Sequence, residues 1–268
     1  FNEGFQPEFL IGSVISWSRK FTPKRFFHTI VQLVAGKNNE GYFHALFRSF
    51  EGEDVDSRPV KSALCKIRKR VSFKFFKNIF ISLLLSYEPH RRTFKGLRIY
   101  AIDGFEARLP RTPELLAQGF QGRSVSRHRQ THMLSMYLTH AHDVLGEVSK
   151  DLRYATRSDE ITDAIDMVRH FERNSVTLYD RLFISRRAIL AHKSAKNYFL
   201  FRCRRKGVIK EIQDFYKTLS LRKKITIEDV EITLIKIYNP KAKEVNVFAT
   251  NLPEEWLTKN IIESLYAK

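Results

Sequence analysis

Two aspartates follow short apolar stretches in the middle of the sequence, and their type and position suit them for chemistry. Asp103 follows Leu97–Ile102, and Asp180 follows Val176–Tyr179. A short apolar run bounded by polar residues predicts a buried strand, and polar side chains at the carboxyl ends of such strands converge on ligands in open α/β sheets. If the two strands are neighbours, we expect both carboxylates to face one crevice.

The chemistry expected of this pair is metal-dependent. Two carboxylates at close range repel each other, and a divalent cation between them removes that cost. Oxygen ligands favour Mg²⁺ or Mn²⁺, and two such ions about 3.5–4 Å apart can support cleavage of a phosphodiester. We therefore predict Asp103 and Asp180 as metal ligands and catalytic residues. An aspartate after a strand is also a common turn residue or helix cap, and that alternative stays open for each.

The elements expected around the aspartates have the order of a ribonuclease H-like fold. Helical patterns begin at Ser158 and at Arg186. The expected strands are Leu97–Ile102, Met133–Thr139, Glu147–Tyr154, Val176–Tyr179 and Tyr198–Phe201. The expected order is three strands followed by helix, strand, helix and strand. In a ribonuclease H-like fold, the first three strands are antiparallel and the later ones are parallel. The predicted class is α/β, with a mixed α+β sheet, and a polar loop over 105–129.

Changes in composition divide the chain into four predicted regions. Residues 1–95 form a basic helical region that could bind DNA, with helices expected after Thr22-Pro23, after Pro59 and after Ser72 as a cap. Residues 96–203 form the catalytic core. Residues 204–250 alternate in hydrophobicity and predict a β-rich insertion with a sheet of its own. Residues 251–268 contain the start of the final core helix, near Thr258.

The segments around both aspartates resemble those of DDE-type bacterial insertion-sequence transposases. Ala101–Gly104, followed by two X-Pro pairs, is similar to the first catalytic-aspartate segment of that family. Leu178–Phe183 resembles the second, and Thr250–Leu252 with Ile262–Tyr266 resembles the approach to the third carboxylate. The resemblance covers the chain from about Leu97 to its end.

The family's third carboxylate follows a closing Tyr and Arg. If Tyr266 is that Tyr, the Arg and the catalytic Glu fall beyond Lys268. Glu254, Glu255 and Glu263 precede Tyr266 and do not match the family's Glu. We therefore expect this chain to be a fragment of a longer protein, truncated before the catalytic Glu and inactive as it stands.

The resemblance implies cut-and-paste transposition of DNA. Asp103 and Asp180, with the missing Glu, would hold two Mg²⁺ (or Mn²⁺) ions. A phosphodiester at the transposon end is hydrolysed, and the released 3′-hydroxyl is joined to the opposite strand or to target DNA. The implied partners are double-stranded DNA, at transposon ends and target, and a second copy in a homodimer. The implied location is bacterial, cytoplasmic and nucleoid-associated.

The charge of the chain agrees with a polyanionic partner. Lys and Arg number 47 against 29 Asp and Glu, a net charge of +18, which favours nucleic acid over an anionic membrane. The longest apolar run, Ile79–Leu85, is too short to cross a bilayer, so no membrane is expected. The predicted DNA contacts are Arg123, Arg127, Arg129, Arg181, Arg202, Arg204, Arg205, Lys206 and Tyr266. Solvated basic loops and a helix-packing tyrosine are the alternatives for these residues.

Two other functions stay open at the level of sequence. One is a transposase-derived DNA-binding protein without catalysis, and the other is a different ribonuclease H-like, metal-dependent nuclease. Zinc is not expected, because Cys65 and Cys203 have no neighbouring cysteine or histidine at ligand spacing.

Overall fold

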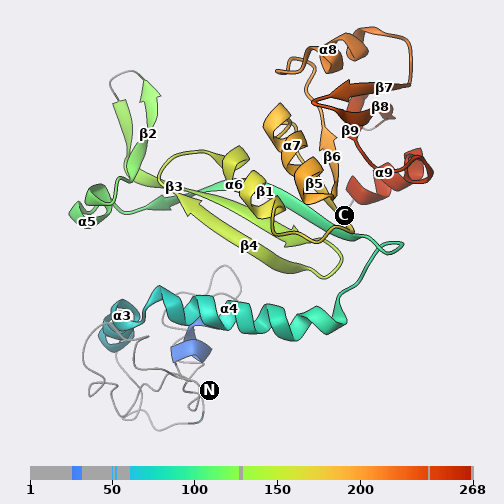
Figure 1. Ribbon diagram of the computed structural model, residues 1–268. Coiled ribbons are helices and arrows are strands. Elements are labelled where there is room, and N and C mark those ends of the chain that lie inside the picture. The colour runs from blue at the N-terminus through green and yellow to red at the C-terminus, as the bar shows by residue number, and fades with distance from the viewer. Residues whose placement is uncertain are drawn as a thin grey trace. The chain divides into compact units, whose positions relative to one another are not determined.

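The computed structural model describes residues 26–31, 50, 52, 61–126, 129–240 and 242–266 (Figure 1). It divides into two compact units, Phe1–Pro89 and His90–Lys268. Each unit is described on its own.

The described part of the first unit is helical. Residues 26–31 are helical, and α3 (Lys61–Arg70), α4 (Phe73–Tyr87) and the 3₁₀ turn η4 (Glu88–His90) follow. The Ser72 side chain accepts a hydrogen bond from the Lys74 backbone N–H at 3.1 Å, so the predicted cap at the start of α4 is confirmed. Among its described residues, Phe26, Phe50, Ile67, Val71 and Phe75 form a buried hydrophobic cluster.

The second unit is built on a mixed sheet with the predicted strand order. Its core strands are β1 (Arg98–Leu109), β3 (Arg129–Asp143), β4 (Val148–Ala155), β5 (Ser175–Tyr179) and β6 (Tyr198–Arg202). They lie side by side in the order β4-β3-β1-β5-β6. The β1–β3 and β3–β4 pairs are antiparallel, whereas the β1–β5 and β5–β6 pairs are parallel. This is the ribonuclease H-like arrangement of a mixed α/β fold.

Helices cover both faces of this sheet. On one face, α6 (Glu160–Val168), α7 (Arg186–Ala195) and α8 (Lys210–Lys217) contribute to the larger core cluster. On the other face, η5 (Glu254–Trp256) and α9 (Lys259–Tyr266) pack on a second cluster. The α6 and α7 helices begin at side-chain caps, which is why they start within two residues of their predicted positions.

The predicted polar loop over 105–129 is wrong for most of its length. Strand β1 continues through Asp103 to Leu109, and α5 (Pro113–Ala117) and β2 (Gln121–Ser126) follow it. The extended part of β1 pairs with β3 as far as Leu109 and Leu134. Phe105, Ala107 and Leu109 alternate with polar residues, as in a half-buried strand. The prolines and glycines that follow, at 110, 113, 119 and 122, nevertheless indicate a loop.

The expectation of a separate sheet over 204–250 is also wrong. Strands β7 (Arg222–Ile227), β8 (Val230–Asn239) and β9 (Glu244–Thr250) form an antiparallel set. Strand β9 pairs with β6, so the set extends the core sheet to nine strands. Within the described residues, the helices are too short or too polar to pass through a bilayer.

Candidate active site

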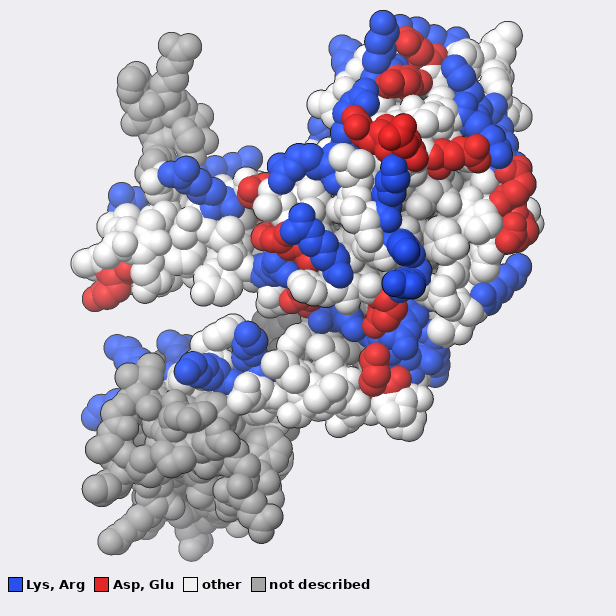
Figure 2. All heavy atoms as spheres, viewed as in Figure 1, with Lys and Arg blue, Asp and Glu red and all other residues white. Residues whose placement is uncertain are grey.

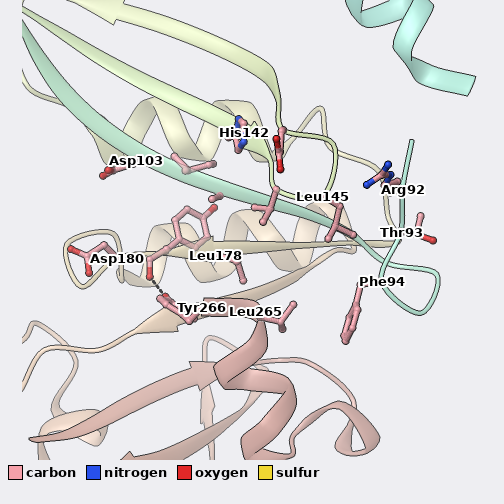
Figure 3. Close-up of a pocket in the computed structure, with 15 residues that line it drawn as sticks. Arg92, Thr93, Phe94, Asp103, His142, Leu145, Leu178, Asp180, Leu265 and Tyr266 are labelled. Atoms are coloured by element: carbon pink, nitrogen blue, oxygen red, sulfur yellow. Dashed lines mark hydrogen bonds between the residues drawn. The ribbon is translucent and has the colours of Figure 1, made fainter. Parts of the chain in front are cut away.

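Asp103 and Asp180 occupy neighbouring positions where the parallel pairing between β1 and β5 ends. The last partners of that ladder are Ile102 and Tyr179, and both pack in the core cluster beneath α6 and α7. The residue after each therefore points to the opposite face of the sheet. Both aspartates are exposed, and both line one cleft of about 890 Å³. Figure 3 shows the two carboxylates at the same end of this cleft.

The strand context of the two aspartates differs from what the sequence indicates. Asp180 directly follows β5, as predicted. Asp103 lies inside β1 rather than at its end, because β1 continues along β3 after its parallel partner has stopped. Both side chains still line the same cleft, since the parallel pairing of β5 with β1 ends just before Asp103.

Few protein groups occupy the oxygens of these carboxylates. Asp103 accepts a hydrogen bond from the backbone N–H of Gly104 at 2.8 Å. Asp180 has no side-chain hydrogen bond or ion pair within the described part of the chain. The pair therefore presents oxygen atoms that are free to bind a ligand.

Two histidines of β3 lie beside Asp103 on the same face. His140 is the direct antiparallel partner of Asp103, and its Nε2 lies 2.8 Å from the Ser149 hydroxyl. Burial and the neighbouring His142 lower the pKa of His140, although Asp103 opposes this effect. His142 lines the cleft (Figure 3). The lowered pKa favours the neutral form of the His140 ring at pH 7, in which it can donate or accept a hydrogen bond.

Tyr266 closes the cleft from α9. Its hydroxyl donates to the carbonyl oxygen of Tyr179 (Figure 3) and accepts from the backbone N–H of Arg202 at 3.0 Å. Burial raises the pKa of this phenol, and the nearby Asp180 charge adds to the effect. Tyr266 thus holds the ends of β5 and β6 beside Asp180, and its predicted contact with DNA stays a prediction.

A third carboxylate approaches Asp103 from α6. A side chain at Gly104 would collide with Glu160, so the absence of a Cβ there lets Glu160 pack against the strand. Burial raises the pKa of Glu160, and the charges of Asp103 and Asp163 raise it further. Even so, no three Asp, Glu, His or Cys side chains among the described residues are arranged to hold a metal ion.

The two aspartates alone fit a divalent cation by the chemistry of their donors. Mg²⁺ is commonly bound by one or two carboxylates, while water and substrate phosphate oxygens complete its coordination. Asp103 and Asp180 supply oxygen ligands, lie on one face and point into an open cleft. They would hold such an ion with most of its coordination positions open to water and substrate.

The predicted DNA-contacting arginines beside the cleft are held in an internal cluster. Arg181 and Arg202 each donate to Glu244, both at 2.9 Å. Both also donate to Asn246, at 3.4 Å and 2.8 Å respectively. Arg204, Arg205 and Lys206 are exposed in the connection between β6 and α8.

The other predicted contacts are Arg123, Arg127 and Arg129. Arg123 is exposed on β2, with a guanidinium nitrogen 3.8 Å from Glu106. Arg127 lies outside the described residues, as does the side chain of Arg129, which begins β3. Of these three residues only Arg123 can be placed, and it does not line the cleft.

Sequence reasoning missed several residues around the site. His142 reaches the cleft because β3 runs antiparallel to β1, and the register between them is not evident from the sequence. Glu244 and Asn246 reach Arg181 only because β9 pairs with β6. Their alternation in a β-like stretch was visible, but the partner of that strand was not.

Comparison with known proteins gives weak structural likenesses only. No protein-family model matches the chain, and no curated protein matches it. A piggyBac transposase synaptic complex with hairpin DNA, solved by cryo-EM, is similar with a TM-score of 0.44 and 12% identity, over 99% of this chain and 59% of that chain. This chain thus spans about 59% of the transposase chain. Endonuclease V of Ciona intestinalis, in complex with a 24mer DNA containing an inosine followed by a ribo-adenosine, has a TM-score of 0.28 and 12% identity, over 57% of this chain and 70% of that chain.

Proposed function

We propose that this chain is the DNA-processing part of a DDE-type, insertion-sequence transposase that hydrolyses phosphodiesters at transposon ends. One observation carries the proposal: Asp103 and Asp180 lie on one face at the end of the β1–β5 parallel ladder and line one open cleft. The motif resemblance around both residues supports it.

In this proposal the aspartates hold divalent cations and orient the scissile phosphodiester. The bound Mg²⁺ or Mn²⁺ would supply Lewis-acid stabilisation of phosphoryl oxygens and activation of water. Asp180, which has no partner in the described region, and Asp103 leave carboxylate oxygens open to such a cation. Tyr266 positions Asp180 by fixing the strand end that precedes it. The resemblance also implies a third carboxylate, and no group of three potential ligands is found among the described residues.

DNA is the substrate that the charge favours. The chain carries a net charge of +18, and basic residues of the β6–α8 connection are exposed close in sequence to β6. Lys and Arg bind the phosphate backbone without reading sequence. We propose duplex DNA as partner and a homodimer as the working form.

A transposase-derived DNA-binding protein without catalysis is the second candidate. It is favoured by the observation that no third ligand joins Asp103 and Asp180 among the described residues. In that case the chain would bind DNA but would hold divalent cations weakly or not at all.

Metal binding by the chain itself separates these two candidates. We expect saturable Mn²⁺ binding, measured by electron paramagnetic resonance, that becomes more than about ten-fold weaker in Asp103→Asn and in Asp180→Asn, since loss of even a ligand's hydrogen-bond partner has roughly that effect. Asp214→Asn is the matched control, because Asp214 is an exposed carboxylate on α8 that pairs with Lys217. Equal Mn²⁺ binding by all four proteins would refute the metal site.

Cleavage of DNA tests the proposed activity directly. Mg²⁺-dependent cleavage of end DNA should disappear in Asp103→Asn and in Asp180→Asn, while duplex binding stays at the wild-type level. Cleavage that survives both substitutions would contradict the proposed function. Wild-type DNA binding with neither cleavage nor metal binding would establish the second candidate.

A further inference from the structure

A second, smaller pocket is lined by Arg181, the residue that follows Asp180 in the chain. Its volume is about 400 Å³, and four cationic side chains line it against a single carboxylate. The lining residues are Arg181, Arg205, Tyr216, Lys236, Lys243, Glu244, Val245 and Asn246. They come from the ends of β5 and β6, from α8, and from β8, β9 and the turn between them. Figure 2 shows Lys and Arg side chains recurring over the part of the molecule that contains α8 and β7 to β9.

One wall of the pocket is a fixed guanidinium. Arg181 donates to Glu244 at 2.9 Å and to Asn246 at 3.4 Å. Glu244 also accepts from Arg202 at 2.9 Å, so one carboxylate faces two guanidinium groups. Because it can neutralise only one of them, a positive charge remains in a rigid position directly after Asp180.

The floor of the pocket contains an ammonium group tied to α8. Lys236 donates to the carbonyl oxygen of Thr218 at 2.5 Å and to that of Tyr216 at 3.4 Å. It also lies over the Phe215 ring, 4.8 Å from the centroid. These are neutral partners, so the charge of Lys236 is held in place without being cancelled.

The mouth of the pocket carries two cations without partners. Arg205 and Lys243 are exposed, and neither makes a hydrogen bond or ion pair within the described residues. Lys243 has a left-handed backbone with φ of 52°, at the residue before β9. Solvated lysines on ordinary surfaces often have no partner, but here both free cations border a concave site that already contains two fixed ones.

We propose that this pocket binds a backbone phosphate of the DNA strand, at a position removed from the phosphodiester that is cut. A phosphate oxyanion needs several convergent N–H donors, and the pocket supplies them from two rigid and two adjustable cations. Arg181 follows Asp180 directly in the chain, so a strand bound in this pocket would be placed beside the aspartate cleft. The identity of the ligand as DNA rests on the proposed function.

The test is the salt dependence of DNA binding by pocket variants. We expect Arg205→Ala and Lys243→Ala each to weaken binding of a fluorescein-labelled duplex about eight-fold at about 0.1 M salt, because each phosphate contact contributes about −0.9 to the log–log salt slope. The slope should fall by about one for each variant, and the loss should be the same for duplexes of unrelated sequence. Fluorescence anisotropy over a salt series measures both quantities.

The matched control is Arg169→Ala, which removes an equal charge from the exposed C-terminal end of α6. It should leave both the affinity and the slope unchanged. Affinity losses no larger than those of this control would overturn the pocket. The double variant Arg205→Ala/Lys243→Ala is also tested with inorganic phosphate. If it loses saturable phosphate binding but binds DNA as the wild type does, the assignment of the ligand to DNA is overturned.

These measurements need neither metal nor cleavage. Failure of the pocket variants to change DNA binding leaves the metal and cleavage results on Asp103 and Asp180 intact. Conversely, if the Asp103 and Asp180 variants change neither metal binding nor cleavage, the proposed function fails but the pocket test still stands. Circular dichroism of Arg205→Ala and Lys243→Ala checks that the fold is retained, which we expect because neither side chain has a partner in the described structure.

Discussion

The hydroxyl of Tyr266 joins α9 to the ends of two strands beside Asp180. It donates to the carbonyl oxygen of Tyr179 and accepts from the N–H of Arg202. We predict that Tyr266→Phe lowers the free energy of unfolding by about 1–3 kcal/mol, because it leaves buried backbone groups without a partner. Urea denaturation followed by circular dichroism measures the loss.

The control for this substitution is Tyr238→Phe. Tyr238 lies on β8 with its side chain exposed, and removing an exposed hydroxyl should change stability by less than about 0.5 kcal/mol. If the two variants are equally stable, the Tyr266 hydroxyl does not hold these strands together. The motif in the sequence indicates Tyr266. It does not indicate the hydrogen bond to Tyr179, because the two residues are 87 positions apart in the chain.

At the scale of elements, a buried histidine connects α6, α7 and β5. The Nε2 atom of His192 lies 2.9 Å from the Tyr179 hydroxyl, and its Nδ1 lies 2.5 Å from Asn197 Oδ1. Asn197 in turn donates to the carbonyl oxygen of Val168 at 3.3 Å. Burial lowers the pKa of His192 to about 4, although its hydrogen bond to Asn197 opposes the shift. The fold therefore keeps this ring neutral.

The depressed pKa of His192 predicts a loss of stability in mild acid. The unfolded chain binds a proton near the ordinary histidine pKa of about 6.5, whereas the fold resists protonation down to about 4. The contribution is complete above pH of about 6.5 and is lost as the pH falls toward 4, with a limiting slope of about 1.4 kcal/mol per pH unit. Urea denaturation at a series of pH values measures this slope.

His192→Gln isolates the contribution of this ring. The variant should be less stable than the wild type at pH 7, because the network is broken, and its stability should change less between pH 6.5 and 5. The pKa of His140 is also lowered, and its contribution remains in both proteins. Parallel stability curves for wild type and His192→Gln would contradict the prediction.

Strands β4 and β5 were both predicted to within one residue, although β4 has no fully buried position. Strand β5 is buried at every position, from Ser175 to Tyr179. The second half of β1 and strand β2 were missed, because Pro110, Pro113, Gly119 and Gly122 in the same stretch indicate a loop. The Asp103–Asp180 pair could be predicted because it needed only strand order, whereas the two-arginine cluster on Glu244 needed the pairing of β9 with β6.

At the scale of the whole second unit, the continuous sheet predicts cooperative unfolding. Leu234 of β8 is fully buried, in the same core cluster as Tyr179 of β5 and Ile189 of α7. Leu234→Ala should lower the free energy of unfolding by about 2–5 kcal/mol. Because one core connects these elements, we expect the loss to reach β5 as well as β8. Native-state amide hydrogen exchange resolves the two strands.

The losses of amide protection that Leu234→Ala causes in β5 and in β8 decide whether residues 204–250 are an independent sheet. In a continuous core, the slowest amides of β5 and of β8 exchange through the same global opening, so Leu234→Ala lowers their protection free energies equally. In an independent sheet, only β7 to β9 would lose protection, and β5 would keep its wild-type rates. Val245→Ala, at a half-exposed position of β9, should change neither strand. A loss confined to β7 to β9 would show that the β6–β9 pairing joins two separately folding parts, and the pocket lined by Arg181 would then lie on a boundary between them.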